Sequence, residues 1–129
     1  MALRGFINFT DITSTGAQDI LNVSGKGIVN NIALRFATTT AGYLIFTIDG
    51  GSPETIDISS LALVGMGTAT APVIADFLTV AVNDITGPNF EYVVQLKANL
   101  PFQTSMLIQV DLTGGGGTEQ SLVTGALEV

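Results

Sequence analysis

The sequence consists of short runs in which apolar and polar residues alternate, separated by clusters of Gly, Pro, Asn, Asp and Ser. Alternation with a period of two indicates a β-strand that buries one of its faces. The run 28–36, IVNNIALRF, predicts a strand with Ile28 and Ile32 on one face and Val29 on the other. In 106–112, MLIQVDL, every second residue is apolar. No stretch combines a 3.6-residue period with capping residues, so the pattern predicts an all-β chain.

Turn-forming residues separate about eight or nine of these runs. At this spacing they predict an antiparallel β-sandwich, either jelly-roll-like or immunoglobulin-like. The sequence DGGSPE supplies residues that adopt a positive φ, which predicts a hairpin between two of the runs. The expected strands lie at 5–9, 19–23, 28–36, 43–50, 55–59, 76–82, 90–97, 106–112 and 121–129.

The length of 129 residues fits a single domain, which we expect to span 1–129. The Gly-rich stretch TGGGGTE at 113–119 is the only linker-like segment. The nine residues after it, SLVTGALEV, are too apolar to remain in water. We therefore expect 113–119 to connect the body of the domain to a C-terminal strand.

The composition excludes several classes of function. The chain contains no Cys and no His, so it lacks thiol nucleophiles, Ser-His-Asp triads and the commonest transition-metal ligands. Four basic residues against eleven acidic ones give a net charge of −7. So few cations disfavour binding to nucleic acid or to an anionic membrane. The N-terminal sequence lacks the apolar core of a secretion signal.

Only 12% of the residues are charged, where about 25% is usual for soluble domains. The mean hydropathy is +0.52. No apolar run approaches the ~20 residues of a membrane-spanning helix. A chain of this kind has more apolar surface than its own core is expected to bury. The composition thus favours a homo-oligomer or a larger protein assembly, although neutral Thr, Ser, Asn and Gln residues would also keep a monomer in solution.

Carboxylate pairs are the remaining catalytic option, as in glycoside hydrolysis. The candidates are Asp49 with Asp57, and Asp84 with Asp111. Asp in a turn ordinarily caps nearby backbone, which is the simpler interpretation. Asp49, Glu54 and Asp57 offer oxygen ligands for calcium, but their spacing matches no calcium loop. We therefore predict a protein that is not an enzyme and holds no metal.

Two further motifs suggest ligands that other observations disfavour. A phosphate loop needs a helix N-terminus after its glycines, and neither GGGG nor SGKG is followed by a predicted helix. No cofactor is therefore expected.

Tyr43 and Tyr92 are candidates for a sugar-stacking platform, but their positions in alternating runs favour packing in the core or at its rim. A carbohydrate- or receptor-binding module remains the alternative function.

Apolar residues in the segment 61–72 suggest a contact with another chain. The local glycines indicate a connection, and connections ordinarily lie on the surface. An apolar patch there is typical of a partner interface, although a further core strand would also explain it. The C-terminal strand is the second candidate. The predicted interface residues are Leu61, Leu63, Val64, Met66, Leu122, Val123, Leu127 and Val129.

Three stretches resemble a known class of protein: SGKGIVNNIALRF, YLIFTIDGG and LPFQTSMLIQVDL. The order of a GKG turn, a DG hairpin and an LPF..S loop is similar to that in small β-sandwich structural proteins of tailed bacteriophages. The resemblance covers roughly residues 18–113. It implies a virion component, in head decoration, tail or baseplate, whose partners are its own copies and other virion proteins. It implies no catalytic residues.

Overall fold

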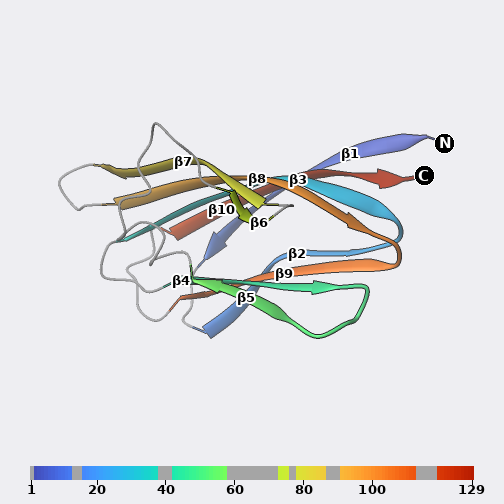
Figure 1. Ribbon diagram of the computed structural model, residues 1–129, viewed down its shortest axis with the longest axis horizontal. Helices are drawn as coiled ribbons and strands as arrows, with labels where there is room; N and C mark the ends of the chain where they lie inside the picture. Colours follow the sequence, from blue (N-terminus) through green and yellow to red (C-terminus); the bar gives the residue numbers. More distant parts are fainter. Residues whose placement is uncertain are drawn as a thin grey trace.

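The chain folds into two layers of β-structure, seen edge-on in Figure 1. The described residues form ten strands. They contain no helix that is long and apolar enough to span a membrane. The computed structural model describes residues 2–12, 16–37, 42–57, 73–75, 78–86, 91–112 and 119–129.

Six strands form the larger antiparallel sheet, in the order β1-β10-β3-β8-β7-β6. Their bounds are Leu3–Ile12 for β1, Glu119–Glu128 for β10, Gly27–Ala37 for β3, Glu91–Phe102 for β8, Leu78–Thr86 for β7 and Val73–Ala75 for β6. The smaller antiparallel sheet has the order β2-β9-β4-β5. Its strands are Gly16–Ser24 for β2, Ser105–Leu112 for β9, Gly42–Ile48 for β4 and Glu54–Asp57 for β5.

The strand order follows from folding the chain back on itself as one long hairpin. Strand β1 pairs with β10, β2 with β9, β3 with β8 and β4 with β5, all antiparallel. Rolling this hairpin adds the pairs β10–β3 and β4–β9 and divides the strands between two sheets. This is the jelly-roll arrangement. The antiparallel sandwich predicted from the sequence is thus confirmed, and the strand order selects the jelly roll over the immunoglobulin-like alternative.

Each expected strand overlaps a strand of the structure, and the short β6 is additional. The core lies between the two sheets and is built from alternate residues. Strand β9 shows this most regularly, since Met106, Ile108, Val110 and Leu112 are all buried. The other buried apolar side chains in the described part of the chain are Ile12, Ile20, Leu21, Val29, Ile32, Leu34, Leu44, Phe46, Leu96, Leu100, Phe102 and Val123.

Strand β3 departs from the predicted alternation. A β-bulge between Val29 and Asn31 gives β3 one more residue, Asn30, than β10 has opposite it, and the pairing with β8 shifts at the same place. The extra residue reverses the faces on one side of the bulge. Val29 and Ile32 are consequently both fully buried, while Ile28 is only partly buried. The prediction that Ile28 and Ile32 share a face opposite to Val29 was therefore wrong, because Val29 and Ile32 both face the core.

Candidate protein–protein interface

The outer face of strand β1 carries exposed apolar side chains. Among the described strands, β1 lies at the edge of the larger sheet and pairs with β10 alone. Phe6 and Ile12 point inward, against or into the core. Because successive side chains of a strand alternate in direction, Leu3, Ile7 and Phe9 point outward. They are 63%, 76% and 57% exposed, respectively.

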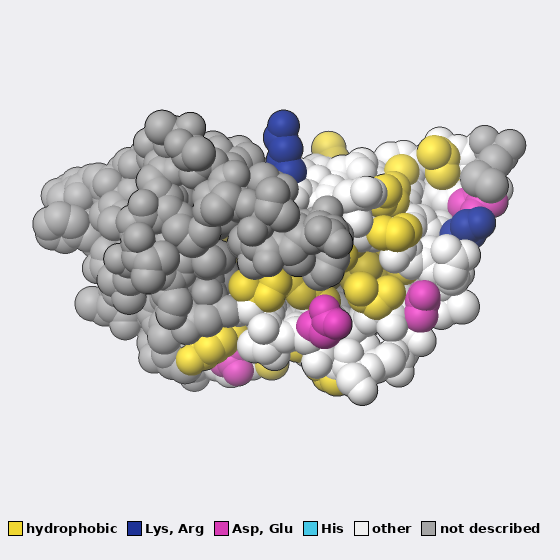
Figure 2. Space-filling model, in the orientation of Figure 1, with side chains coloured by type: hydrophobic (Ala, Val, Ile, Leu, Met, Phe, Trp, Pro, Cys, Tyr) yellow, Lys and Arg dark blue, Asp and Glu magenta, His cyan; other side chains and the backbone are white. Residues whose placement is uncertain are grey.

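Strands β10 and β3 extend this apolar surface. Leu122 is directly opposite Phe9 in the register, and Ala33 is directly opposite Leu122. These side chains line a shallow, open depression of about 160 Å³, whose walls include the polar Gln120 and Arg35. In Figure 2, hydrophobic side chains reach the surface between polar ones over the described part of the molecule. The surface called the apolar strip below consists of Leu3, Ile7, Phe9 and Leu122.

The C-terminal residues predicted to meet a partner lie in different environments. Val123 is fully buried in the core, and Leu127 packs against the core. Leu122 belongs to the apolar strip, while Val129 is 80% exposed. Strand β10 is central in its sheet, between β1 and β3, and this explains much of its apolar character without a second chain. The other predicted interface residues, Leu61, Leu63, Val64 and Met66, lie outside the described residues.

The backbone of β1 has one side directed away from its own sheet. The amide of Val129 donates a hydrogen bond to the carbonyl oxygen of Ala2 at 3.0 Å. In an antiparallel pair, the residues that face the neighbouring strand alternate with those that face away. The even-numbered residues of β1 therefore face β10. The odd-numbered residues direct their N–H and C=O groups toward the free edge. From Leu3 to Phe9 these groups are available to another strand, whereas the Asp11 carbonyl oxygen accepts a hydrogen bond from Gln18 Nε2 at 3.0 Å.

Strands β1 and β2 border an open seam between the two sheets. The side-chain amide of Asn8 crosses the seam and donates from Nδ2 to the backbone oxygen of Ile20, at a β-bulge in β2. Beside this contact lies a hollow of about 330 Å³, whose lining includes the apolar Phe6, Leu21 and Val23. The described residues thus leave this flank of the sandwich partly uncovered.

Asp49 organises a second feature, at the end of the sandwich where several hairpins turn. Its own turn joins β4 to β5, with the amide of Gly51 donating to the carbonyl oxygen of Ile48 at 3.0 Å. Asp49 and Gly50 have φ values of 54° and 70°. Two successive positive φ angles define a type I′ turn, which matches the twist of a hairpin. The hairpin predicted from DGGSPE is confirmed by the β4–β5 pairing.

The carboxylate of Asp49 binds the turn between β8 and β9. Oδ1 accepts hydrogen bonds from the backbone amides of Gln103, Thr104 and Ser105 at 2.9, 2.7 and 3.1 Å. The Thr104 hydroxyl also donates to Oδ1, at 3.2 Å. These donors favour the ionised carboxylate and lower the pKa of Asp49, with the Thr104 amide contributing most. Asp49 thus fixes the relative position of two hairpins.

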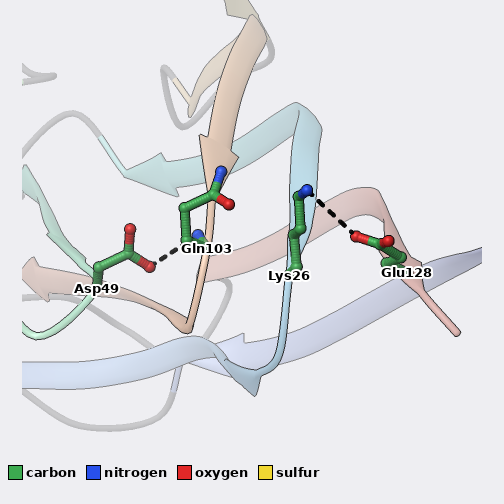
Figure 3. A network of polar contacts seen from close by, with 4 residues as sticks. All are labelled: Lys26, Asp49, Gln103 and Glu128. Atoms are coloured by element: carbon green, nitrogen blue, oxygen red, sulfur yellow. Dashed lines mark hydrogen bonds and ion pairs between the residues drawn. The ribbon is translucent and has the colours of Figure 1, made fainter.

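A third turn joins the same end of the sandwich. The amide of Gly25, between β2 and β3, donates to the Thr104 carbonyl oxygen at 2.8 Å. Next to it, Lys26 Nζ lies 3.6 Å from Glu128 Oε2. Figure 3 shows the Asp49 and Lys26 contacts from close by. The GKG, DG and LPF..S motifs of the sequence therefore meet in space, because their turns are linked directly through Thr104.

The carboxylates considered for catalysis do not form a described acid–base site. Asp49 is occupied by the β8–β9 turn. Glu54 is exposed on β5, Asp111 is half-buried on β9, and the side chains of Asp57 and Asp84 lie outside the described part. Within the described ranges, no three acidic side chains are grouped so that they could hold a metal ion. What Asp49 demonstrably does is hold turns together.

Of the two tyrosines considered for sugar stacking, Tyr43 is half-buried on β4. It alternates with the buried Leu44, so it lies on the outer face of the smaller sheet. The side chain of Tyr92 lies outside the described residues. Tyr43 alone does not form an aromatic platform.

No protein-family model matches the chain, and no curated protein matches it in sequence. The proposal for its function therefore depends on the fold and on the surface of the molecule.

Proposed function

We propose that this protein is a non-enzymatic structural component of a bacteriophage virion, which acts through contacts with other protein chains. The observation that carries the proposal is the apolar strip. Ile7 and Phe9 are 76% and 57% exposed on a strand whose inward face is packed normally. Large apolar side chains grouped on the outer face of a sheet are typical of a protein-interaction surface.

The fold and the composition support this proposal. Jelly rolls build the capsids of many viruses, although the same fold also occurs in lectins, so the fold alone does not decide the function. The charged fraction of 12% leaves little charged surface to oppose close packing of chains. Full burial of a side chain such as Ile or Phe contributes roughly 1.5–3 kcal/mol. Ile7 and Phe9 still have more than half of that surface to bury.

The carbohydrate-binding alternative is less favoured by the described aromatic side chains. Phe46 and Phe102 are buried, and Phe6 packs against the core. Phe9 is exposed but lacks the polar group with which Tyr or Trp contacts a sugar hydroxyl. Binding on a glycan array that persists after the strip is removed would favour this alternative.

The test compares two double variants in particles purified from a culture that produces the chain. Ile7→Asp with Phe9→Asp places two charges in the apolar strip. Ser52→Asp with Thr55→Asp is the matched control, because it adds the same charge at exposed positions of the β4–β5 hairpin. We expect the wild type and the control to co-purify with particles in stoichiometric amounts, and the strip variant to remain free.

Circular dichroism should show the same β signature for both double variants, so that loss of folding is not mistaken for loss of assembly. Absence of the wild-type chain from particles would contradict the proposal. Equal incorporation of the strip variant would contradict the assignment of the interface to β1.

A further inference from the structure

We infer that β1 pairs edge to edge with β1 of a second copy, antiparallel, about a two-fold axis that passes through Ile7. The inference rests on the proposed function, because it names the first partner of an assembly protein. This pairing joins the larger sheets of two copies into one continuous sheet. The evidence comes from the free backbone edge, the order of charges on β1 and the side chains that the pairing brings together.

The edge of β1 has the properties of a pairing surface. It is ten residues long and pairs with β10 without a bulge. Natural edge strands are usually protected by Lys, Pro or a bulge, and β1 contains none of these. The residues that direct backbone groups to the free edge, which include Gly5 and Asp11, are all exposed. At the end of the strand, the side-chain amide of Gln18 donates a hydrogen bond to the Asp11 carbonyl oxygen at 3.0 Å. A further strand therefore has access to the edge from Leu3 to Phe9.

The charges on β1 disfavour parallel pairing of two copies. The strand carries one cation, Arg4, near its start and one anion, Asp11, near its end. In antiparallel pairing about Ile7, Arg4 lies opposite Thr10 and Asp11 lies opposite Leu3, so no like charges meet, and the two kinds of charge point to opposite faces of the sheet. Parallel pairing would place each charge next to its own like charge, which is unfavourable. The order of charges on the strand thus favours the antiparallel direction over the parallel one.

The pairing register follows from the geometry of the edge. Hydrogen-bonded pairs must join residues that face the free edge, which are the odd-numbered ones. With Ile7 opposite Ile7 of the second copy, Phe9 lies opposite Gly5, where the ring covers a position without a side chain. The apolar strips of the two copies then form one surface. The second copy also borders the open seam beside β2, where the hollow of about 330 Å³ lies.

The first experiment measures the mass of the native protein by sedimentation, using two substitutions at the axis. Ile7→Pro removes an amide that faces the free edge, and proline is tolerated on that side of an edge strand. Ile7→Ala is the control, because it shortens the same side chain and keeps the amide. We expect a dimer for the wild type, a weaker dimer for Ile7→Ala and a monomer for Ile7→Pro. A monomeric wild type at high concentration, or equal dimerisation of the two variants, would overturn the inference.

The second experiment measures the direction and register without disturbing the backbone, and it decides the matter if Ile7→Pro fails to fold. The chain has no Cys, so a single introduced cysteine carries one nitroxide label per copy. Leu3→Cys and Asp11→Cys are both exposed and equally distant from Ile7. In the proposed dimer each label lies eight residues from its counterpart, or about 27 Å at ~3.4 Å per residue.

Equal distances near this value, measured by pulsed dipolar electron paramagnetic resonance, support the inference. Distances that differ by ten ångströms or more, a separation near that of adjacent strands, or no coupling would overturn it. A monomer that still enters particles would remove the dimer and leave the proposed function intact. A dimer that is absent from particles would support the β1 pairing and contradict the proposed function.

Discussion

At Gly125, strand β10 packs closely against β3 and against the Phe6 ring of β1. The substitution Gly125→Ala tests that packing. A Cβ atom at this position would lie 2.2 Å from the carbonyl oxygen of Ile28 and 2.5 Å from Cζ of Phe6. An ordinary contact begins at about 3.4 Å. The methyl group therefore needs more than one ångström of extra space. A flexible side chain could supply it, but the nearest atom belongs to the backbone of β3.

An additional methyl group in a tightly packed site typically destabilises a protein by 1–3 kcal/mol. We expect about 3 kcal/mol for Gly125→Ala, since a strand must move as well as the Phe6 ring. For a domain of this size the melting temperature should fall by roughly 10 °C. Gly5→Ala is the matched control on the adjoining strand, because its Cβ would lie 3.8 Å from the nearest atom, the Gly125 oxygen. The control should change stability by less than about 0.5 kcal/mol.

The assay is urea unfolding of dilute protein, followed by circular dichroism. Gly125→Ala should lower the midpoint without changing the slope, which indicates a loss of native stability alone. If Gly125→Ala and Gly5→Ala unfold within 0.5 kcal/mol of each other, the close packing of β10 over β3 and Phe6 is wrong.

Three further predictions concern stability. Asp49→Asn should lower the melting temperature at neutral pH. The folded pKa of Asp49 lies below its ordinary 3.8, so this stabilisation is present above pH 3.8 and is lost as the pH falls through the folded pKa. The melting temperatures of the wild type and Asp49→Asn should therefore converge in acid. An undiminished difference between them in acid would contradict the role of the charge. Ile108→Ala, at a fully buried core position, should cost about 2–5 kcal/mol in chemical unfolding, and a smaller loss would indicate a loosely packed core. Ser121→Ala should leave stability equal or raise it by up to ~1 kcal/mol, since the buried Ser121 hydroxyl has no hydrogen-bond partner in the described structure; clear destabilisation would show that this hydroxyl is satisfied.

The alternation of residues was sufficient to predict the class of fold. Strand β9 shows why, since its residues from Met106 to Leu112 alternate without interruption between the core and the opposite face. The bulge in β3 was not predictable from the same pattern. Ile28 and Val29 are both apolar, so their hydropathy does not reveal which one points inward. The choice depends on the register with β10 and β8, whose residues opposite Val29 lie about 96 and 71 positions further along the sequence.

The candidate interface was predictable only in part. Leu122 and Val129 lie at the surface, but the apolar sequence of β10 also reflects its central place in the sheet. The sequence of β1 alternates like the other strands, and only the strand order identifies it as an edge. The role of Asp49 was hidden for a similar reason. The DG turn was visible in the sequence, but the carboxylate binds a turn more than 50 residues later.

Hydrogen exchange along β1, measured by NMR for each amide, tests the central claim most directly. The amides of Phe6 and Asn8 face β10, whereas those of Gly5, Ile7 and Phe9 face the free edge. If a second copy covers this edge, the amides of Gly5, Ile7 and Phe9 should gain protection as the protein concentration rises, and approach that of Asn8. If these three amides exchange without protection at every concentration, while Phe6 and Asn8 stay protected, β1 is a free edge and the proposed pairing is wrong.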